Sequence, residues 1–241
     1  MKSTKLIQHY IGPHILKITL HDAASANALS LEAAHELKAI IRKLSQPQSP
    51  VKVLIFTGSG RFFCSGGNLK FYQSLKSKTG GLKVNREIAK VLSSLDRLPL
   101  YKIAWVNADC LGGGLELMSC FDHIAAVPHC LFGFWQSRQA LSFAWGGGAR
   151  LTRRIPLQIV KNSLLSSQVF SAFEAQKIGL IDRVFSRFEI EAQVLQLAEK
   201  ISHSSADAQL GIRKLNAKNE SVIFSKLWWS PAHRSVLFRQ K

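Results

Sequence analysis

Hydrophobic positions along the chain follow two spacings, one typical of buried strands and one typical of helices that cover them. The runs Val51–Phe56 and Leu100–Val106 are almost continuously apolar, which predicts strands buried on both faces. Between them, apolar residues recur every three or four positions over Asn85–Leu98, which predicts an amphipathic helix that Pro99 ends. Strand, helix and strand in this order indicate βαβ units and a mostly parallel sheet.

The same patterns predict further elements on both sides of this unit. Ser30 is placed to cap a helix with apolar positions from Ala33 to Leu44, and Ser171 with Glu174 fits a capping box. Gly179 fits the left-handed position just after that second helix. The other expected strands are Ile15–Leu20, Ile124–Val127 and Leu180–Phe185, and the other expected helices are Glu189–Ser202 and Ala206–Lys218. We therefore predict an α/β core over residues 1–185 and a C-terminal helical region over 186–241 that serves packing or oligomerisation.

Composition narrows the classes of protein that fit. The 241 residues are 46% hydrophobic and 20% charged, as in ordinary globular domains. An excess of 32 Lys and Arg over 15 Asp and Glu gives a net charge of +17, which attracts polyanions, although the basic residues form no long block. Four isolated cysteines without zinc-ligand spacing predict reduced thiols and no metal site. Neither a signal peptide nor the roughly 20 apolar residues of a membrane span are found, so we expect a cytoplasmic protein without a membrane partner.

Two glycine-rich turns follow predicted strands, at Phe63–Lys70 and at Leu111–Glu116. Glycine allows positive φ and close approach of a ligand to the backbone, and unpaired N–H groups at the start of a helix favour negative charge. If both turns met around one carbonyl oxygen, they would form an oxyanion hole. Each turn taken singly fits an ordinary tight turn better than a ligand-binding one. The chain has no P-loop, no dinucleotide-binding fingerprint and no G-x-S-x-G nucleophile elbow.

Taken together and in order, these segments resemble the crotonase (enoyl-CoA hydratase/isomerase) family. The resemblance covers about residues 15–185 well and the C-terminal helices loosely. The motifs that carry it are Asn27–Ser30, Val53–Gly58, Phe63–Lys70, Gly112–Leu117, Cys120–Asp122, Trp145–Leu151 and Phe173–Asp182.

This resemblance implies a crotonase-like ββα spiral core and an acyl-CoA substrate, with coenzyme A as part of the thioester and no other cofactor. It implies that the N–H groups of Gly67 and Gly113 stabilise the enolate oxygen. It also implies a homotrimer or a dimer of trimers. The substrate-binding residues that it implies are Asn27, Ala28, Leu29, Gly66, Gly67, Asn68, Leu69, Lys70 and Gly113.

Hydratases of the family use two glutamates, and only one is found here. The first matches Glu116, whereas the second, fourteen residues after Asp122, matches Gln136. An amide orients water but does not exchange a proton near neutral pH as a carboxylate does. Hydration and isomerisation are therefore doubtful for this chain. Asn68 and Ala108 are further departures from the family pattern.

Several alternatives stay open at this point. Decarboxylation of a malonyl-type thioester, or hydrolysis of a β-ketoacyl one, needs mainly the oxyanion hole. A weakly catalytic relative that binds RNA through its basic surface is a second class, although no recognised RNA-binding motif supports it. A non-catalytic CoA-binding subunit is a third.

Overall fold

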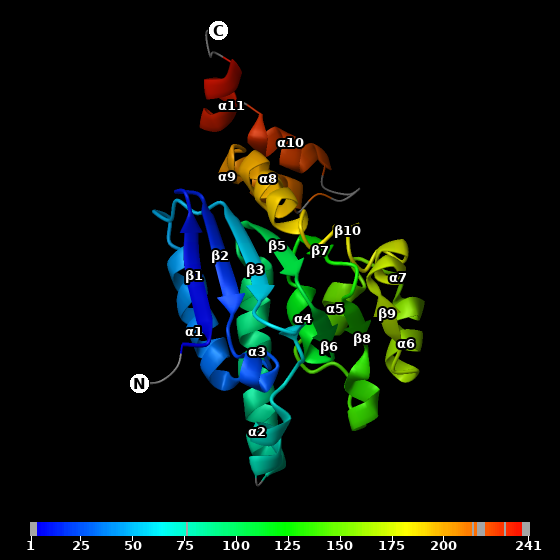
Figure 1. The fold of residues 1–241 in the computed structure, drawn as a ribbon. Coiled ribbons are helices and arrows are strands. Elements are labelled where there is room, and N and C mark those ends of the chain that lie inside the picture. Colours follow the sequence, from blue (N-terminus) through cyan, green and yellow to red (C-terminus); the bar gives the residue numbers. More distant parts are fainter. Residues whose placement is uncertain (1–3, 76, 214, 216–219, 229, 238–241) are drawn as a thin grey trace.

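The main sheet contains six strands in the order β1-β2-β3-β5-β7-β10 (Figure 1). The computed structural model describes residues 4–75, 77–213, 215, 220–228 and 230–237. Among the described strands of this sheet, β1 and β2 pair antiparallel and the other neighbouring pairs are parallel, which confirms the predicted mostly parallel sheet. The strands are β1 (Leu6–Ile11), β2 (Ile15–Leu20), β3 (Val53–Gly58), β5 (Tyr101–Val106), β7 (His123–Ala126) and β10 (Arg183–Val184).

A second sheet of four short strands lies beside the first, in the order β4-β6-β8-β9. The apolar pattern predicts none of these strands, because three residues are too few to show a period. Three of them, β4, β6 and β8, come directly before or beside the segments that form the candidate site. Its strands are β4 (Phe62–Cys64), β6 (Asp109–Leu111), β8 (Leu131–Gly133) and β9 (Val169–Ser171).

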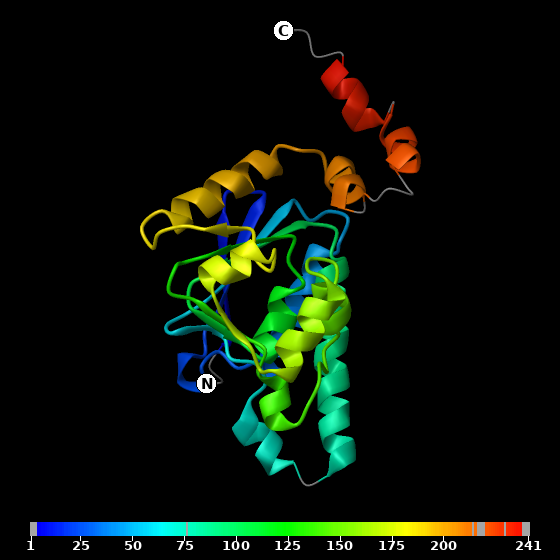
Figure 2. The same ribbon diagram turned by 90° about the vertical axis from the view of Figure 1, so that its right-hand side faces the viewer.

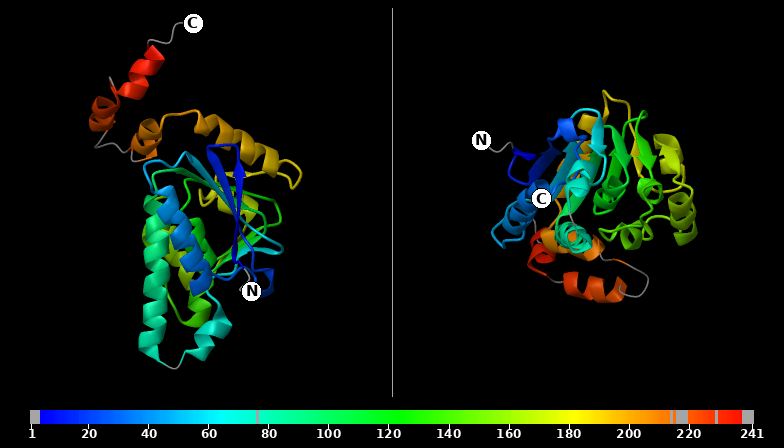
Figure 3. Two further views of the ribbon diagram at one scale, coloured as in Figure 1. Left: turned by 90° about the vertical axis from the view of Figure 1, so that its left-hand side faces the viewer. Right: turned by 90° about the horizontal axis from the view of Figure 1, so that it is seen from below.

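Three long helices cover the main sheet. The helices α1 (Leu31–Leu44) and α3 (Lys78–Arg97) pack against each other, and α8 (Ile190–Ser202) packs on β2, β3, β5 and β7 (Figure 3). The α2 helix (Leu69–Ser74) and the start of α3 project beyond the sheets at the lower end of Figure 2. The remaining helices are α4 (Gly113–Met118), α5 (Gly147–Leu151), α6 (Leu157–Leu165), α7 (Ala172–Lys177), α9 (Ala206–Arg213), α10 (Glu220–Leu227) and α11 (Pro231–Leu237), with 3-10 turns η1 (Ala23–Ser25) and η2 (Trp135–Gln139).

Local capping signals fix several helix boundaries. The Ser30 hydroxyl accepts the Ala33 N–H at 3.2 Å, and Ser171 with Glu174 forms the complete capping box. Gly179 has φ of 81° after α7, as predicted. The α3 helix begins seven residues before the predicted start, because Ser77 caps it. Positions 214 and 216–218 of the helix expected to run to Lys218 lie outside the described residues.

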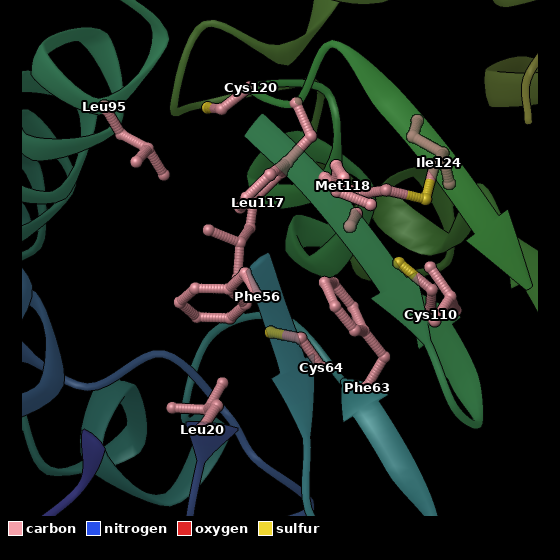
Figure 4. Close-up of a cluster of buried hydrophobic side chains, with 14 of the residues drawn as sticks. Leu20, Phe56, Phe63, Cys64, Leu95, Cys110, Leu117, Met118, Cys120 and Ile124 are labelled. Atoms are coloured by element: carbon pink, nitrogen blue, oxygen red, sulfur yellow. The ribbon is translucent and has the colours of Figure 1, made fainter. Parts of the chain in front are cut away.

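The hydrophobic core lies between the two sheets and the helices that cover them. Figure 4 shows Phe56 of β3, Phe63 of β4, Leu95 of α3 and Leu117 of α4 around one interior region. The interior also holds the predicted reduced thiols, Cys64, Cys110, Cys120 and Cys130, all buried and unpaired. Burial raises the pKa of the Cys64 thiol to about 11. Within the described part of the chain, no helix is long and apolar enough to cross a bilayer.

The predicted boundary at residue 185 falls just before α8. Ile190, Val194 and Ala198 of this helix are buried in the same hydrophobic cluster as the strands. The α8 helix therefore contributes to the core, and the chain continues through α9 to α10 and α11, which lie away from it (Figure 1).

Candidate active site

The structure brings the two glycine-rich turns side by side. A methyl group placed on Gly66 would lie 2.9 Å from the backbone nitrogen of Gly113. The Leu29 N–H donates to the Gly66 carbonyl at 2.7 Å, and Leu29 forms a parallel bridge with Gly67. The three segments predicted to bind substrate, residues 27–29, 66–70 and 113–116, therefore meet although more than eighty residues separate the first from the last.

Close packing explains why the second turn contains consecutive glycines. Gly112 has φ of 53°, a conformation that favours glycine. A methyl group on Gly114 would lie 2.1 Å from the Cys64 carbonyl oxygen, so any side chain there would force β4 and α4 apart. The local sequence thus permits α4 to start directly against the first turn.

The N–H groups of Gly67 and Gly113 are both unpaired. Across the residues that the structure describes, neither donates to a backbone or side-chain acceptor. Both glycines are only partly buried, so their N–H groups are open to water or a ligand. Two unpaired donors on adjacent turns are therefore suited to bind one shared acceptor.

Glu116 lies in α4, directly beyond the second turn, with only 2% of its surface exposed. Its Oε2 accepts the N–H groups of Trp145 at 2.7 Å and Gly147 at 2.9 Å, and its Oε1 accepts that of Ala144 at 3.2 Å. Burial raises the pKa of this carboxyl, and the three hydrogen bonds offset only part of that effect. Glu116 therefore holds the loop over 144–147 in place, and a larger fraction of it is protonated than of an exposed glutamate.

A buried arginine strengthens this attachment. Arg150 donates from Nη2 to the carbonyl oxygens of Glu116 at 3.0 Å and Trp145 at 2.8 Å, and from Nε to Ser119 at 2.9 Å. The backbone of Trp145 is consequently bonded at both its N–H and its carbonyl.

Gln136 lies in η2, with 8% of its surface exposed. Neither its amide oxygen nor its amide nitrogen has a hydrogen-bond partner within the described chain. A buried amide without partners costs about 1–3 kcal/mol, so such groups are commonly completed by a ligand or water. No hydrogen bond joins Gln136 to Glu116 among the described residues.

The other predicted binding residues serve the turns themselves. Asn27 is fully buried, and its side chain bonds the Asp22 N–H and the carbonyls of Ser59 and Phe62. Asn68, where the family often has aspartate, caps α2 by accepting the Phe71 N–H at 3.0 Å. Ala28 and Leu29 are buried core residues. Leu69 and Lys70, in the first turn of α2, are exposed, so both are open to a ligand.

Two side chains that the site predictions omit lie against the glycine pair, and a third residue joins them. A methyl group on Gly113 would lie 2.4 Å from Cζ3 of Trp145, and one on Gly67 would lie 2.8 Å from Cε2 of Tyr72. Asn85 of α3 joins the two aromatic side chains, because its Oδ1 accepts from both. Trp145 stands in a motif that the sequence singles out, whereas nothing in the local pattern marks Tyr72 or Asn85.

In the part of the chain that the structure covers, no group of three or more His, Cys, Asp or Glu side chains is placed to hold a metal ion.

The family model of enoyl-CoA hydratase/isomerase matches residues 11–223. The chain belongs to the enoyl-CoA hydratase/isomerase family. It is 32% identical over 198 residues to mevalonyl-coenzyme A hydratase of Aspergillus fumigatus, covering 81% of this chain and 72% of the relative. It is 26% identical over 256 residues to ethylmalonyl-CoA decarboxylase of Gallus gallus, covering 99% and 84% of the two chains.

Solved structures agree with this assignment. The enoyl-CoA hydratase of Bacillus anthracis superposes with a TM-score of 0.87 at 26% identity, over 97% of this chain and 91% of that one. The enoyl-CoA hydratase of Thermoplasma volcanium has the same fold, with a TM-score of 0.88 at 20% identity over 100% and 98% of the chains. This member of the enoyl-CoA hydratase/isomerase family is therefore an acyl-CoA-processing enzyme with a crotonase fold.

Proposed function

We propose that the enzyme decarboxylates a malonyl-type CoA thioester, with the enolate oxygen held by the N–H groups of Gly67 and Gly113. The observation that supports this reaction is that two unpaired N–H donors occur together with an amide, rather than a carboxylate, at Gln136. The donors would stabilise an enolate, and the amide would be unable to transfer the protons that hydration requires.

Decarboxylation fits these groups because it forms an enolate without a base. The bond between the α-carbon and its carboxylate breaks, CO₂ leaves, and the electron pair moves into the enolate. The α-carbon then takes one proton from water, and the product is the shortened acyl-CoA. CoA enters as part of the substrate, and the reaction needs no other cofactor.

Similarity to a decarboxylase supports the same reaction. The Gallus gallus ethylmalonyl-CoA decarboxylase matches 99% of this chain. A second candidate is hydration of an enoyl thioester, with water oriented by the free amide of Gln136. The unpartnered polar atoms of that side chain and the similarity to the Aspergillus fumigatus hydratase favour it.

A panel of CoA thioesters separates the candidates. We would incubate the full chain with ethylmalonyl-, methylmalonyl-, crotonyl- and β-ketoacyl-CoA and follow the products by mass spectrometry. Loss of CO₂ from the malonyl-type substrates is expected, with little hydration of crotonyl-CoA. Fast hydration without decarboxylation would contradict the proposal, and binding without turnover would identify a CoA-binding subunit.

Removal of one N–H tests the role of the glycines. Proline is tolerated at the first position of a helix, so Gly113→Pro deletes the donor at the start of α4. Its ring would also clash with Trp145, whose Cζ3 lies 2.4 Å from the β position. The variant is therefore made in a Trp145→Ala background and compared with Trp145→Ala alone. A further fall of about 10²–10³ in kcat is expected, and equal activities would contradict the role of Gly113.

A further inference from the structure

The indole of Trp145 fills the space directly against both glycines of the candidate site. Its Cζ3 lies 2.4 Å from the β position of Gly113, and its Cζ2 lies 3.6 Å from that of Gly67. Only 3% of the Trp145 surface is exposed. A ring in this place would limit the room beside a thioester carbonyl bound at the two N–H groups.

The ring is held in position from two sides. Its Nε1 donates to Oδ1 of Asn85 at 2.9 Å, and the Tyr72 hydroxyl donates to the same oxygen at 2.7 Å. Asn85 is in turn oriented by its Nδ2, which donates to the Gly81 carbonyl at 3.1 Å. On the other side, Glu116 and Arg150 bind the backbone of Trp145. Moving the indole would break its bond to Asn85 and leave buried polar atoms unpaired, which is unfavourable.

We propose that Trp145 sets the specificity of the site for short acyl groups, with Asn85 as the residue that positions it. This inference rests on the proposed binding of a thioester at Gly67 and Gly113. A small acyl group fits beside the indole, whereas a long chain has to displace it. The indole lies against the β position of Gly113, and the Gly113 N–H has no acceptor among the described residues.

Saturated acyl-CoAs test the proposal independently of the reaction. They have no carboxylate to lose and no double bond to hydrate, so calorimetry of acetyl-, butyryl- and octanoyl-CoA reports binding alone. The wild-type enzyme is expected to bind octanoyl-CoA at least about tenfold more weakly than butyryl-CoA, a ratio that pocket size can produce. Trp145→Ala is expected to reduce this ratio by about tenfold or more.

Two further variants and one control complete the experiment. Trp145→Phe keeps an aromatic ring of smaller size and should give an intermediate ratio, which matters if the alanine variant folds poorly. Asn85→Leu removes the hydrogen bond to Trp145 while keeping a side chain of similar size. It should also lower the ratio of butyryl- to octanoyl-CoA affinity. Trp228→Ala, in the C-terminal helical region and half exposed, should leave the ratio unchanged.

The outcomes distinguish this inference from the function on which it rests. Equal binding of octanoyl- and butyryl-CoA to the wild type, or full discrimination in Trp145→Ala and Trp145→Phe, would overturn the role of Trp145 while leaving thioester binding intact. Failure of the wild type to bind any of the three thioesters would overturn the proposed function and this inference with it.

Discussion

Glu116 and Gln136 are both buried, but their polar atoms are satisfied in opposite ways. The carboxylate accepts three backbone N–H groups, whereas the amide has no partner within the described residues. A group that is fully bonded maintains structure at low cost, and an unbonded buried group is available to a ligand. We therefore expect substitution of Glu116 to lower the stability of the fold and substitution of Gln136 to change the reaction.

Gln136→Glu tests the assignment of the second catalytic position. A carboxylate there would complete the pair that hydratases of the family use, and its burial would raise its pKa toward neutrality. Hydration of crotonyl-CoA is expected to rise by about 10²-fold over the wild type, measured by loss of the enoyl absorbance. Gln139→Glu, at the other end of the same 3-10 turn, is the matched control. Hydration that stays at background in Gln136→Glu would show that another residue occupies the second position.

Glu116→Gln should reduce stability in a pH-dependent way. An amide offers one acceptor where the carboxylate has two, so the variant should lose about 1–3 kcal/mol of unfolding free energy. Burial raises the pKa of Glu116 in the folded state above its unfolded value of about 4.3. The folded state therefore binds the Glu116 proton more tightly than the unfolded state does. The stabilisation that this gives is fully present below the unfolded pKa and is lost as the pH rises through the folded pKa.

Urea unfolding of both proteins between pH 4 and pH 7 measures this effect. The difference between wild type and Glu116→Gln should be largest at the acidic end and decrease toward neutral pH. A difference that grows with pH would mean that the hydrogen bonds lower the pKa more than burial raises it.

At the scale of elements, an ionic cluster joins β5, the α4–β7 turn and α9. Asp122 accepts Nζ of Lys102 at 3.0 Å and Nε of Arg213 at 2.9 Å. The Lys102 side chain is fully buried, and burial lowers its pKa while the Asp122 carboxylate opposes that change. Arg213 also donates to the Leu98 carbonyl, so this cluster attaches α9 to the core.

Asp122→Ala should therefore be strongly destabilising, because it leaves the Lys102 ammonium buried without a counter-charge. The expected loss is about 3–5 kcal/mol of unfolding free energy in urea. Asp96→Ala is the matched control, since it removes an ion pair with Arg153, whose side chain is 58% exposed. The control should cost less than about 1 kcal/mol. Similar losses in the two variants would mean that the cluster contributes no more than a surface pair.

Elements are predictable from sequence where their determinants are local. The caps at Ser30 and Ser171 act within four residues, and both helices begin where these caps predict. The strand β1 is missed because Leu6–Ile11 alternates poorly, and it forms mainly through pairing with β2, which is distant from any local signal within the strand itself. Contact of Trp145 with Gly113, and of Asn85 with both aromatic rings, depends on tertiary packing that no short window contains.

At the scale of the whole molecule, the C-terminal helices carry several exposed apolar side chains. Ile212 of α9, Phe224 of α10 and Val236 of α11 are each at least 60% exposed. The α10 and α11 helices lie away from the body of the fold (Figure 1), whereas α9 is attached to it through Arg213. The predicted homotrimer or dimer of trimers would bury such surface, and it stays a prediction for light scattering to measure.

The net charge of +17 also acts on the molecule as a whole. Basic side chains attract the phosphates of CoA over a distance that shrinks from about 10 Å at 0.1 M salt to about 3 Å at 1 M. The KM for a CoA thioester should therefore rise several-fold over this range, with kcat unchanged. The matched N-acetylcysteamine thioester lacks the phosphates, so its KM should stay constant. An equal rise for both substrates would show that salt acts on the protein rather than on attraction of the CoA moiety.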